Sequence, residues 1–251
     1  MAKSPPMVLA FAASDPTGGA GVQADLLTLA ARGCHPLSVL TAVTVQDTSG
    51  VESIHPLEPS RVADQARYLL ADLSVAAFKL GVLGSAGNAS AIAQILAKHP
   101  RVPVVVDPVL ASARGDALST DGSVIAMKER IFPLATVATP NSLEAGRLGG
   151  VDAMLKSGCR YVLVTGTHDA TAEVINRLYD ASGLVREDRW RRLPGEYHGS
   201  GCTLASALAA ALANGLAVPE AAGDAQHYTW RALEAGFRPG AGQFIPQRFL
   251  Q

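Results

Sequence analysis

A short turn of small residues has the clearest chemical potential in this sequence. It reads His198-Gly199-Ser200-Gly201-Cys202, and helix-favouring residues follow it as far as Asn214. Backbone N–H groups at the start of a helix lack partners within the helix, and with the helix dipole they favour a negatively charged group. Glycines let the backbone approach such a group closely. The turn indicates an anion site, although an ordinary glycine-containing turn with a serine cap would have a similar sequence.

Cys202 stands at the expected start of that helix. A thiol at a helix N-terminus can have its pKa lowered, and the thiolate could accept a proton from a substrate hydroxyl group. The alternative is a small buried apolar side chain, which is the usual role of cysteine. Cys202 is therefore a candidate general base.

A second glycine-rich segment, 14–25, follows an apolar run and opens another expected helix. Its glycines, at positions 18, 19 and 21, match neither the dinucleotide-binding G-x-G-x-x-G pattern nor a P-loop. Close approach of the backbone to a ligand still fits the segment, with Gly19 at its centre. Asp25 could form a hydrogen bond to a polar ring substituent, or it could be a carboxylate in the first turn of a helix.

Two further carboxylates follow expected strands. Asp107 comes directly after a run of valines, and Glu144 lies three residues after Asn141. Hard oxygen ligands of this kind could hold Mg²⁺ together, directly or through water. A strand-end turn and a helix cap at Asn141 would leave the same pattern. Gln46 follows another strand, and its amide suits the edge of a heteroaromatic ring, although it could equally be solvent-exposed.

The elements that must position these residues alternate along the chain. Apolar runs of strand length are separated by segments of helical period, which predicts an α/β fold with a mainly parallel sheet covered on both faces. Ligands of such sheets bind beyond the carboxyl ends of the strands. We expect strands at 7–13, 37–45, 77–80, 102–106, 137–139 and 161–165, and an antiparallel pair at 174–179 and 189–193. We expect helices at 21–32, 59–73, 86–98, 121–131, 142–148, 202–214 and 218–235.

Composition limits the classes of protein to which the chain can belong. It has 251 residues, 48% of them hydrophobic and 17% charged, with a net charge of −1. We expect one domain over 1–251, with a Gly/Pro-rich tail at 236–251 lying over the surface. No basic run points to a nucleic acid, because the charged segment 186–192 mixes both signs. Three cysteines without a CxxC pair and no apolar run of membrane length indicate a cytoplasmic protein with no membrane partner.

Taken together and in this order, the segments resemble bacterial hydroxymethylpyrimidine/phosphomethylpyrimidine kinases, thiamine-pathway members of the ribokinase-like superfamily. The resemblance implies a three-layer α/β/α ribokinase-like fold. It also implies ATP- and Mg²⁺-dependent phosphorylation of 4-amino-5-hydroxymethyl-2-methylpyrimidine and of its monophosphate. A homodimer is expected, and a monovalent cation is an additional candidate cofactor. The similarity runs from about residue 7 to 233 and is carried by 14–25, 41–48, 79–81, 107–109, 139–144 and 198–203.

The resemblance also implies a role for each matching residue. Gly199, Ser200 and Gly201 would form the anion hole and Cys202 would be the general base. Asp107, Asn141 and Glu144 would organise Mg²⁺ and the triphosphate, beside Thr165 and Gly166. The pyrimidine would contact Gly19, Asp25, Thr44, Gln46, Val82 and Val109.

Thr165 departs from the family pattern, since many members have a lysine there near the ATP phosphates. Charge neutralisation would then come from Mg²⁺, another residue or a nearby arginine. Two alternatives stay open. Pyridoxal/pyridoxine kinase is one, because that ring also carries a hydroxymethyl group. A catalytically weak relative that only binds pyrimidine is the other, and Thr165 is the feature in its favour.

Overall fold

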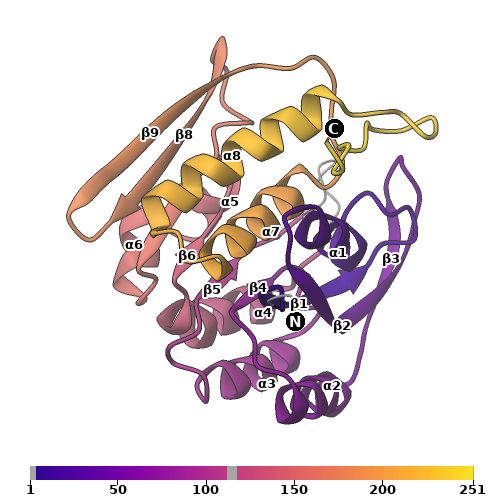
Figure 1. Ribbon diagram of the computed structural model, residues 1–251, viewed down its shortest axis with the longest axis vertical. Coiled ribbons are helices and arrows are strands. Elements are labelled where there is room, and N and C mark those ends of the chain that lie inside the picture. The colour runs from indigo at the N-terminus through magenta and orange to yellow at the C-terminus, as the bar shows by residue number, and fades with distance from the viewer. Residues whose placement is uncertain (1–3, 112–117, 251) are drawn as a thin grey trace.

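The computed structural model describes residues 4–111 and 118–250, which form a central sheet between two layers of helices (Figure 1). The strands lie in the order β3-β2-β1-β4-β5-β6-β7-β8-β9. The six from β2 to β7 are parallel to one another, while β3, β8 and β9 at the two edges pair antiparallel. The strands are β1 Met7–Ser14, β2 His35–Gln46, β3 Val51–Pro56, β4 Ala77–Leu80, β5 Val104–Val106, β6 Val137–Ala138, β7 Tyr161–Val164, β8 Glu173–Asp180 and β9 Gly183–Arg191.

Helices cover both faces of the sheet and give it two apolar cores. One core holds side chains of α2, α3, α4 and α6, and the other holds side chains of α1, α7 and α8. The helices are α1 Gly21–Ala31, α2 Pro59–Asp72, α3 Ala86–Leu96, α4 Asp121–Ala126, α5 Ser142–Arg147, α6 Val151–Lys156, α7 Ser200–Ala213 and α8 Val218–Glu234. A π-helical turn at Met127–Ile131 and a 3-10 turn at Phe132–Leu134 follow α4.

Successive side chains of β1 point alternately into the two cores. Leu9 and Phe11 point into the first core, and Val8 and Ala10 point into the second, all of them fully buried. A strand buried on both faces needs apolar residues at every position, which is why β1 is an unbroken apolar run. The three-layer α/β/α architecture expected from the sequence is thereby confirmed.

Most expected elements end within two residues of the observed ones, but two elements were missed and the bounds of two others were wrong. The edge strand β3 and the short helix α6 were not predicted. The second arm of the antiparallel pair runs over Gly183–Arg191 instead of 189–193, because its charged, half-exposed side chains conceal the strand period. The helix expected at 121–131 is α-helical only to Ala126 and continues as a π turn.

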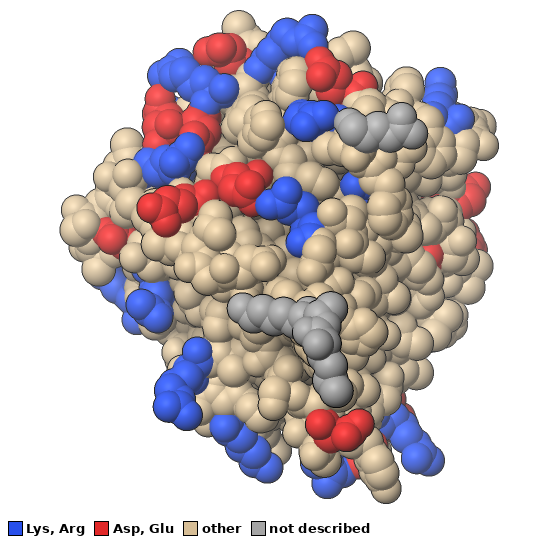
Figure 2. Space-filling model, viewed as in Figure 1, with Lys and Arg blue, Asp and Glu red and all other residues tan. Residues whose placement is uncertain are grey.

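Charge is mixed on the face shown in Figure 2, where basic and acidic side chains alternate over the β8–β9 hairpin. Arg177 and Arg189 both pair with Glu187, and Arg186 pairs with Asp188. These pairs account for the charged segment 186–192 as a solvated hairpin. Within the described residues, no helix combines the length and apolar character needed to span a membrane.

The C-terminal tail packs against two loops that follow strands. Phe244 exchanges backbone hydrogen bonds with Glu196 and His198, and Gln243 donates one to Thr48. Phe237 pairs antiparallel with Ile245. The tail therefore fastens the loop that leads into α7.

Candidate active site

A pocket of about 330 Å³ opens at the carboxyl ends of the parallel strands. It is lined by the loops that follow β1, β2, β4, β5, β6 and β7 and by the start of α7, where ligands of such sheets bind. The structure therefore brings most of the sequence-predicted site residues to one place. These are Thr44, Gln46, Val82, Asp107, Val109, Asn141, Glu144, Thr165, Gly199, Ser200, Gly201 and Cys202.

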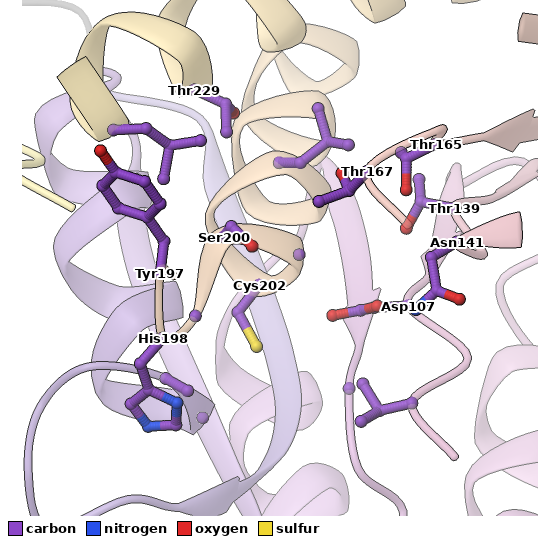
Figure 3. Close-up of a pocket in the computed structure, with 18 of the residues that line it drawn as sticks. Asp107, Thr139, Asn141, Thr165, Thr167, Tyr197, His198, Ser200, Cys202 and Thr229 are labelled. Carbon is purple, nitrogen blue, oxygen red and sulfur yellow. The ribbon is translucent and has the colours of Figure 1, made fainter. Parts of the chain in front are cut away.

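The start of α7 lies at this pocket, where Figure 3 labels Ser200 and Cys202. Gly199 is the N-cap, with a left-handed φ of 78° and no side-chain cap. A Cβ there would lie 1.9 Å from the carbonyl oxygen of Gly19, so only glycine fits. The serine-cap alternative is therefore wrong, and the N–H groups of Ser200, Gly201 and Cys202 occupy the first-turn positions that lack intrahelical acceptors.

Cys202 and Asp107 face the same space in Figure 3. Burial raises the pKa of the thiol to about 12, against the lowering effect of Lys79, and the charges of Asp107 and Asp25 raise it further. The lowered thiol pKa expected from the helix start is thus wrong for the ligand-free protein, because burial and two nearby carboxylates outweigh the favourable charges. Burial also raises the pKa of Asp107 to about 6.

Asp25 does not line the pocket. It is fully buried, its carboxylate lies 2.7 Å from Nζ of Lys79, and Ser206 donates a hydrogen bond of 2.8 Å to it. The structure therefore gives Asp25 a different contact from the pyrimidine edge that we expected, and the physical reason is the buried ammonium group. Lys79 itself lines the pocket, so the buried ion pair places an ammonium group at the pocket wall.

The two carboxylates expected to hold Mg²⁺ lie close enough to influence one another. Burial, and then the charge of Asp107, raises the pKa of Glu144 to about 7. Glu144 accepts hydrogen bonds from the N–H groups of Asn141 and Leu110, while the Asn141 side chain accepts one from Glu144 N–H. The helix-cap alternative is confirmed as a capping box, and Glu144 also lines the pocket.

Oδ2 of Asp107 is buried and has no hydrogen-bond partner among the described residues. An orphaned carboxylate oxygen beside a second carboxylate of raised pKa is a setting that a hard cation would satisfy. The described residues do not contain three acidic, histidine or cysteine side chains grouped around one point. A magnesium ion here would therefore need oxygen ligands from water or from a bound phosphate, as Mg²⁺ commonly has.

Thr165 and the two remaining predicted glycines take structural positions. Thr165 exchanges backbone hydrogen bonds with Pro140 and Ser142, which joins the loops after β6 and β7. Gly166 donates to the side chain of Asn176, and a Cβ on it would lie 2.4 Å from the carbonyl oxygen of Ile175. Gly19 packs against His198 in the same way. Neither glycine is among the residues that line the pocket.

The cations that line the pocket already have partners. Lys79 pairs with Asp25, and Arg191 pairs with Glu234. Arg192 donates to the carbonyl groups of three residues in the loop after β7, namely Thr167, Asp169 and Thr171. Arg192 therefore shapes the loop that follows Thr165.

Sequence reasoning assigned no role to three residues that the structure brings to the pocket: Asp15, Lys79 and His198. His198 contacts both Asp15 and Gln46. A lysine within the short buried strand β4 was the available signal for Lys79, since a buried charge requires a partner. Asp15 and His198 were both inside quoted motifs, but nothing in the sequence shows that these motifs meet.

Comparison with known proteins agrees with this geometry. The family model for phosphomethylpyrimidine kinase matches residues 15–247. The chain is 42% identical over 255 residues to a hydroxymethylpyrimidine/phosphomethylpyrimidine kinase of Streptomyces coelicolor, covering 95% of this chain and 93% of that one.

Solved structures confirm the ribokinase-like fold. The pyridoxal kinase of Staphylococcus aureus in complex with pyridoxal has a TM-score of 0.89 at 26% identity, covering 98% of this chain and 94% of that one. The phosphomethylpyrimidine kinase of Clostridium difficile 630 has a TM-score of 0.78 at 30% identity, covering 91% and 99%. From the site and these similarities together, the chain belongs to the phosphomethylpyrimidine kinase family.

Proposed function

We propose that this protein transfers the γ-phosphoryl group of ATP to 4-amino-5-hydroxymethyl-2-methylpyrimidine and then to its monophosphate. The observation that carries the proposal is the meeting, in one pocket, of the free N–H groups at the start of α7 with Cys202, Asp107 and Gln46. Phosphoryl transfer needs mainly positioning and charge neutralisation, and the free N–H groups at the start of α7 offer hydrogen-bond donors for both.

The first turn of α7 would stabilise the charge that develops on the transferred group. The N–H groups of Ser200, Gly201 and Cys202 point where the helix dipole also favours an anion. Gly199 holds the backbone in this turn, because a side chain there would strike the carbonyl oxygen of Gly19. A Cβ at Gly201 would make only ordinary contact with Asp107, at 3.6 Å. Gln46 would read the edge of the pyrimidine, beside Thr44, Val82 and Val109.

Cys202 would receive the proton of the substrate hydroxyl group. Its thiol pKa of about 12 in the ligand-free protein means that it first has to lose its own proton. Lys79 favours the thiolate, and Asp107 opposes it. The balance between these two charges therefore sets how readily Cys202 can act as a base.

Mg²⁺ is part of the proposal, with Asp107 and Glu144 as its carboxylates and Asn141 beside them. When bound there, the ion would neutralise phosphate charge and also the Asp107 charge that raises the pKa of Cys202. The raised pKa values of both carboxylates, at about 6 and about 7, support a site that gains from a cation. We also propose that the protein acts in the cytoplasm as a homodimer, as the resemblance implied.

Pyridoxine kinase activity is the second candidate, because the pyridoxal kinases of Staphylococcus aureus and Bacillus subtilis superpose with TM-scores of 0.89 and 0.88. Initial rates of ADP formation with the pyrimidine alcohol, its monophosphate and pyridoxine separate the candidates. We expect kcat/KM for the pyrimidine alcohol to exceed that for pyridoxine. Faster turnover of pyridoxine would reverse the assignment, and tight pyrimidine binding without turnover would favour a binding protein.

Thr165→Lys tests whether the departure at this position limits nucleotide binding. A lysine beside the nucleotide would add a cation near the phosphates, so we expect the KM for ATP to fall several-fold while the KM for the pyrimidine stays the same. An unchanged KM for ATP would show that Thr165 does not limit nucleotide binding.

A further inference from the structure

His198 is placed between two polar side chains of the pocket. Its Nε2 atom lies 2.8 Å from Oδ2 of Asp15 and 3.3 Å from the amide nitrogen of Gln46. A ring nitrogen carries either a proton or a lone pair, so it cannot donate to one neighbour and accept from the other. The chemistry of Asp15 decides which of the two it carries.

Asp15 is an ionised carboxylate and can only accept hydrogen bonds. Burial acts to raise its pKa, but hydrogen bonds from His198, Ala20 and Thr17 bring the pKa down to about 2. Since the carboxylate holds no proton near neutral pH, Nε2 of His198 must carry the proton and donate it to Asp15.

The imidazole ring is held in this position by its surroundings. The backbone N–H of His198 donates to the carbonyl group of Phe244 at 2.8 Å. A Cβ on Gly19 would lie 2.4 Å from Cδ2 of the ring, so the glycine backbone packs directly against it. The ring is therefore fixed with a protonated Nε2, which has no lone pair to accept a hydrogen bond from the Gln46 amide 3.3 Å away.

A fixed N–H group favours one orientation of the Gln46 amide. An amide NH₂ facing the N–H would bring two donors together, whereas rotation by 180° brings the amide oxygen there with almost no change of shape. We propose that His198, held by Asp15, is a positioning residue that turns the oxygen of Gln46 toward the imidazole and its NH₂ group toward the ligand. This inference rests on the proposed function, because Gln46 lines the substrate pocket.

The consequence is a rule about the ring edge that the pocket accepts. In a 4-aminopyrimidine, the ring nitrogen N3 accepts a hydrogen bond and the neighbouring amino group donates one. An oriented Gln46 matches both, since its NH₂ donates to N3 and its oxygen has a second lone pair for the amino group. The 4-oxo analogue presents the opposite pattern, an N3–H donor beside a carbonyl oxygen, and leaves both groups mismatched.

The test compares kcat/KM for the 4-amino alcohol with kcat/KM for its 4-oxo analogue. In the wild type we expect the ratio to favour the amino compound by about tenfold or more, the cost of leaving buried polar groups unpaired.

His198→Phe keeps a flat ring without the N–H, so Gln46 can rotate and the ratio should fall about tenfold, mainly through KM. His198→Gln restores a donor and should keep the ratio. His35→Phe, an exposed histidine at the other end of β2, is the matched control and should change nothing.

The inference would be wrong if His198→Phe had the same kcat/KM ratio as the wild type. It would also be wrong if the ratio fell as far in His198→Gln as in His198→Phe. A second measurement needs no variant. The ¹⁵N spectrum of histidine-labelled wild type should show a proton on Nε2 of His198, and a proton on Nδ1 alone would contradict the argument. A wild type that turns over neither pyrimidine would contradict the proposed function instead, so the two failures can be told apart.

Discussion

At the scale of residues, this site holds groups whose ionisation is unfavourable in the free protein. Burial raises the pKa of Cys202 to about 12, that of Glu144 to about 7 and that of Asp107 to about 6. Strongly perturbed groups gathered in one pocket are typical of sites that bind charged ligands. The charged forms of these groups therefore carry an electrostatic cost in the free protein, and a bound cation would relieve it.

Cys202→Ala should reduce kcat for the pyrimidine alcohol by about 10²-fold or more, the usual contribution of a general base. The KM for the pyrimidine alcohol should change little, because alanine leaves in place the residues proposed to contact the pyrimidine, which are Thr44, Gln46, Val82 and Val109. Steady-state kinetics measures both values. Cys34→Ala, which removes a buried thiol of the α1–α7 core, is the matched control and should retain turnover. An unchanged rate in Cys202→Ala would leave Cys202 with a packing role only.

The pH dependence of the rate tests the same residue. Because the pKa of the thiol is raised to about 12, the share of thiolate grows as pH rises through the neutral and mildly alkaline range. We expect kcat to rise over this range in the wild type and to be flat in Cys202→Ala. A wild-type profile that levels off near pH 6 would point to Asp107 as the proton acceptor.

Asp107→Asn should stabilise the ligand-free protein at neutral pH while it abolishes most activity. The folded pKa of Asp107, about 6, lies above its ordinary value of 3.8. Its contribution to stability is therefore fully present below about pH 4 and is lost as pH rises through about 6, on the order of 3 kcal/mol. Asparagine does not ionise, so thermal denaturation between pH 4 and 8 should show a smaller decline with pH than in the wild type. Equal declines in both proteins would contradict the assignment.

At the scale of elements, the start of α7 is fixed by contacts with distant segments. Arg248 in the tail is almost completely buried and donates to the carbonyl groups of Gly18 and Gly19 and to Thr203. Tyr228 of α8 donates to the carbonyl group of Arg248 at 2.6 Å. The tail thus joins the glycine loop after β1 to the first turn of α7, which places Gly19 against Gly199.

Arg248→Met should lower the free energy of unfolding by about 2–4 kcal/mol, since three carbonyl and hydroxyl oxygens lose a charged donor. It should also raise the KM of the substrates, because the two glycine loops are no longer joined. Denaturant titration and steady-state kinetics measure the two effects. Phe249→Ala, at the neighbouring exposed position, is the control. A KM equal to that of the wild type would confine Arg248 to a role in stability.

Local pattern predicts elements well where burial is one-sided or complete. β1 was predicted almost residue for residue, because a strand buried on both faces leaves an unbroken apolar run. β4 was predicted at its observed bounds although Lys79 interrupts its apolar residues. β3 and β9 were missed or misplaced, because both lie at sheet edges where half-exposed polar residues remove the period. The ends of α7 and α8 followed from glycine and proline signals around them.

At the scale of the whole molecule, all nine described strands belong to one sheet, and helices pack against both of its faces. The cores on its two faces share the strands β1, β4 and β5, so neither half can keep its core without the other. The gathering of Thr44, Asp107 and Asn141 in one pocket was predictable because each follows or ends a strand and ligands bind beyond the carboxyl ends of parallel strands. The resemblance added Cys202 to this group. The pairing of Asp25 with Lys79 was not, since it depends on which way two side chains turn inside a packed core.

A single cooperative transition should follow from this architecture. We expect calorimetry of the ligand-free protein to give one peak, with equal calorimetric and van't Hoff enthalpies, as single domains usually do. Two separate transitions would contradict the assignment of one domain over residues 1–251.

The most direct test of the account is ATP consumption by the wild type with Mg²⁺ and 4-amino-5-hydroxymethyl-2-methylpyrimidine. We predict ADP formation that depends on the added pyrimidine, with kcat/KM at least tenfold above that for pyridoxine. A pocket that turned over pyridoxine faster, or that consumed no ATP with either compound, would contradict the central claim.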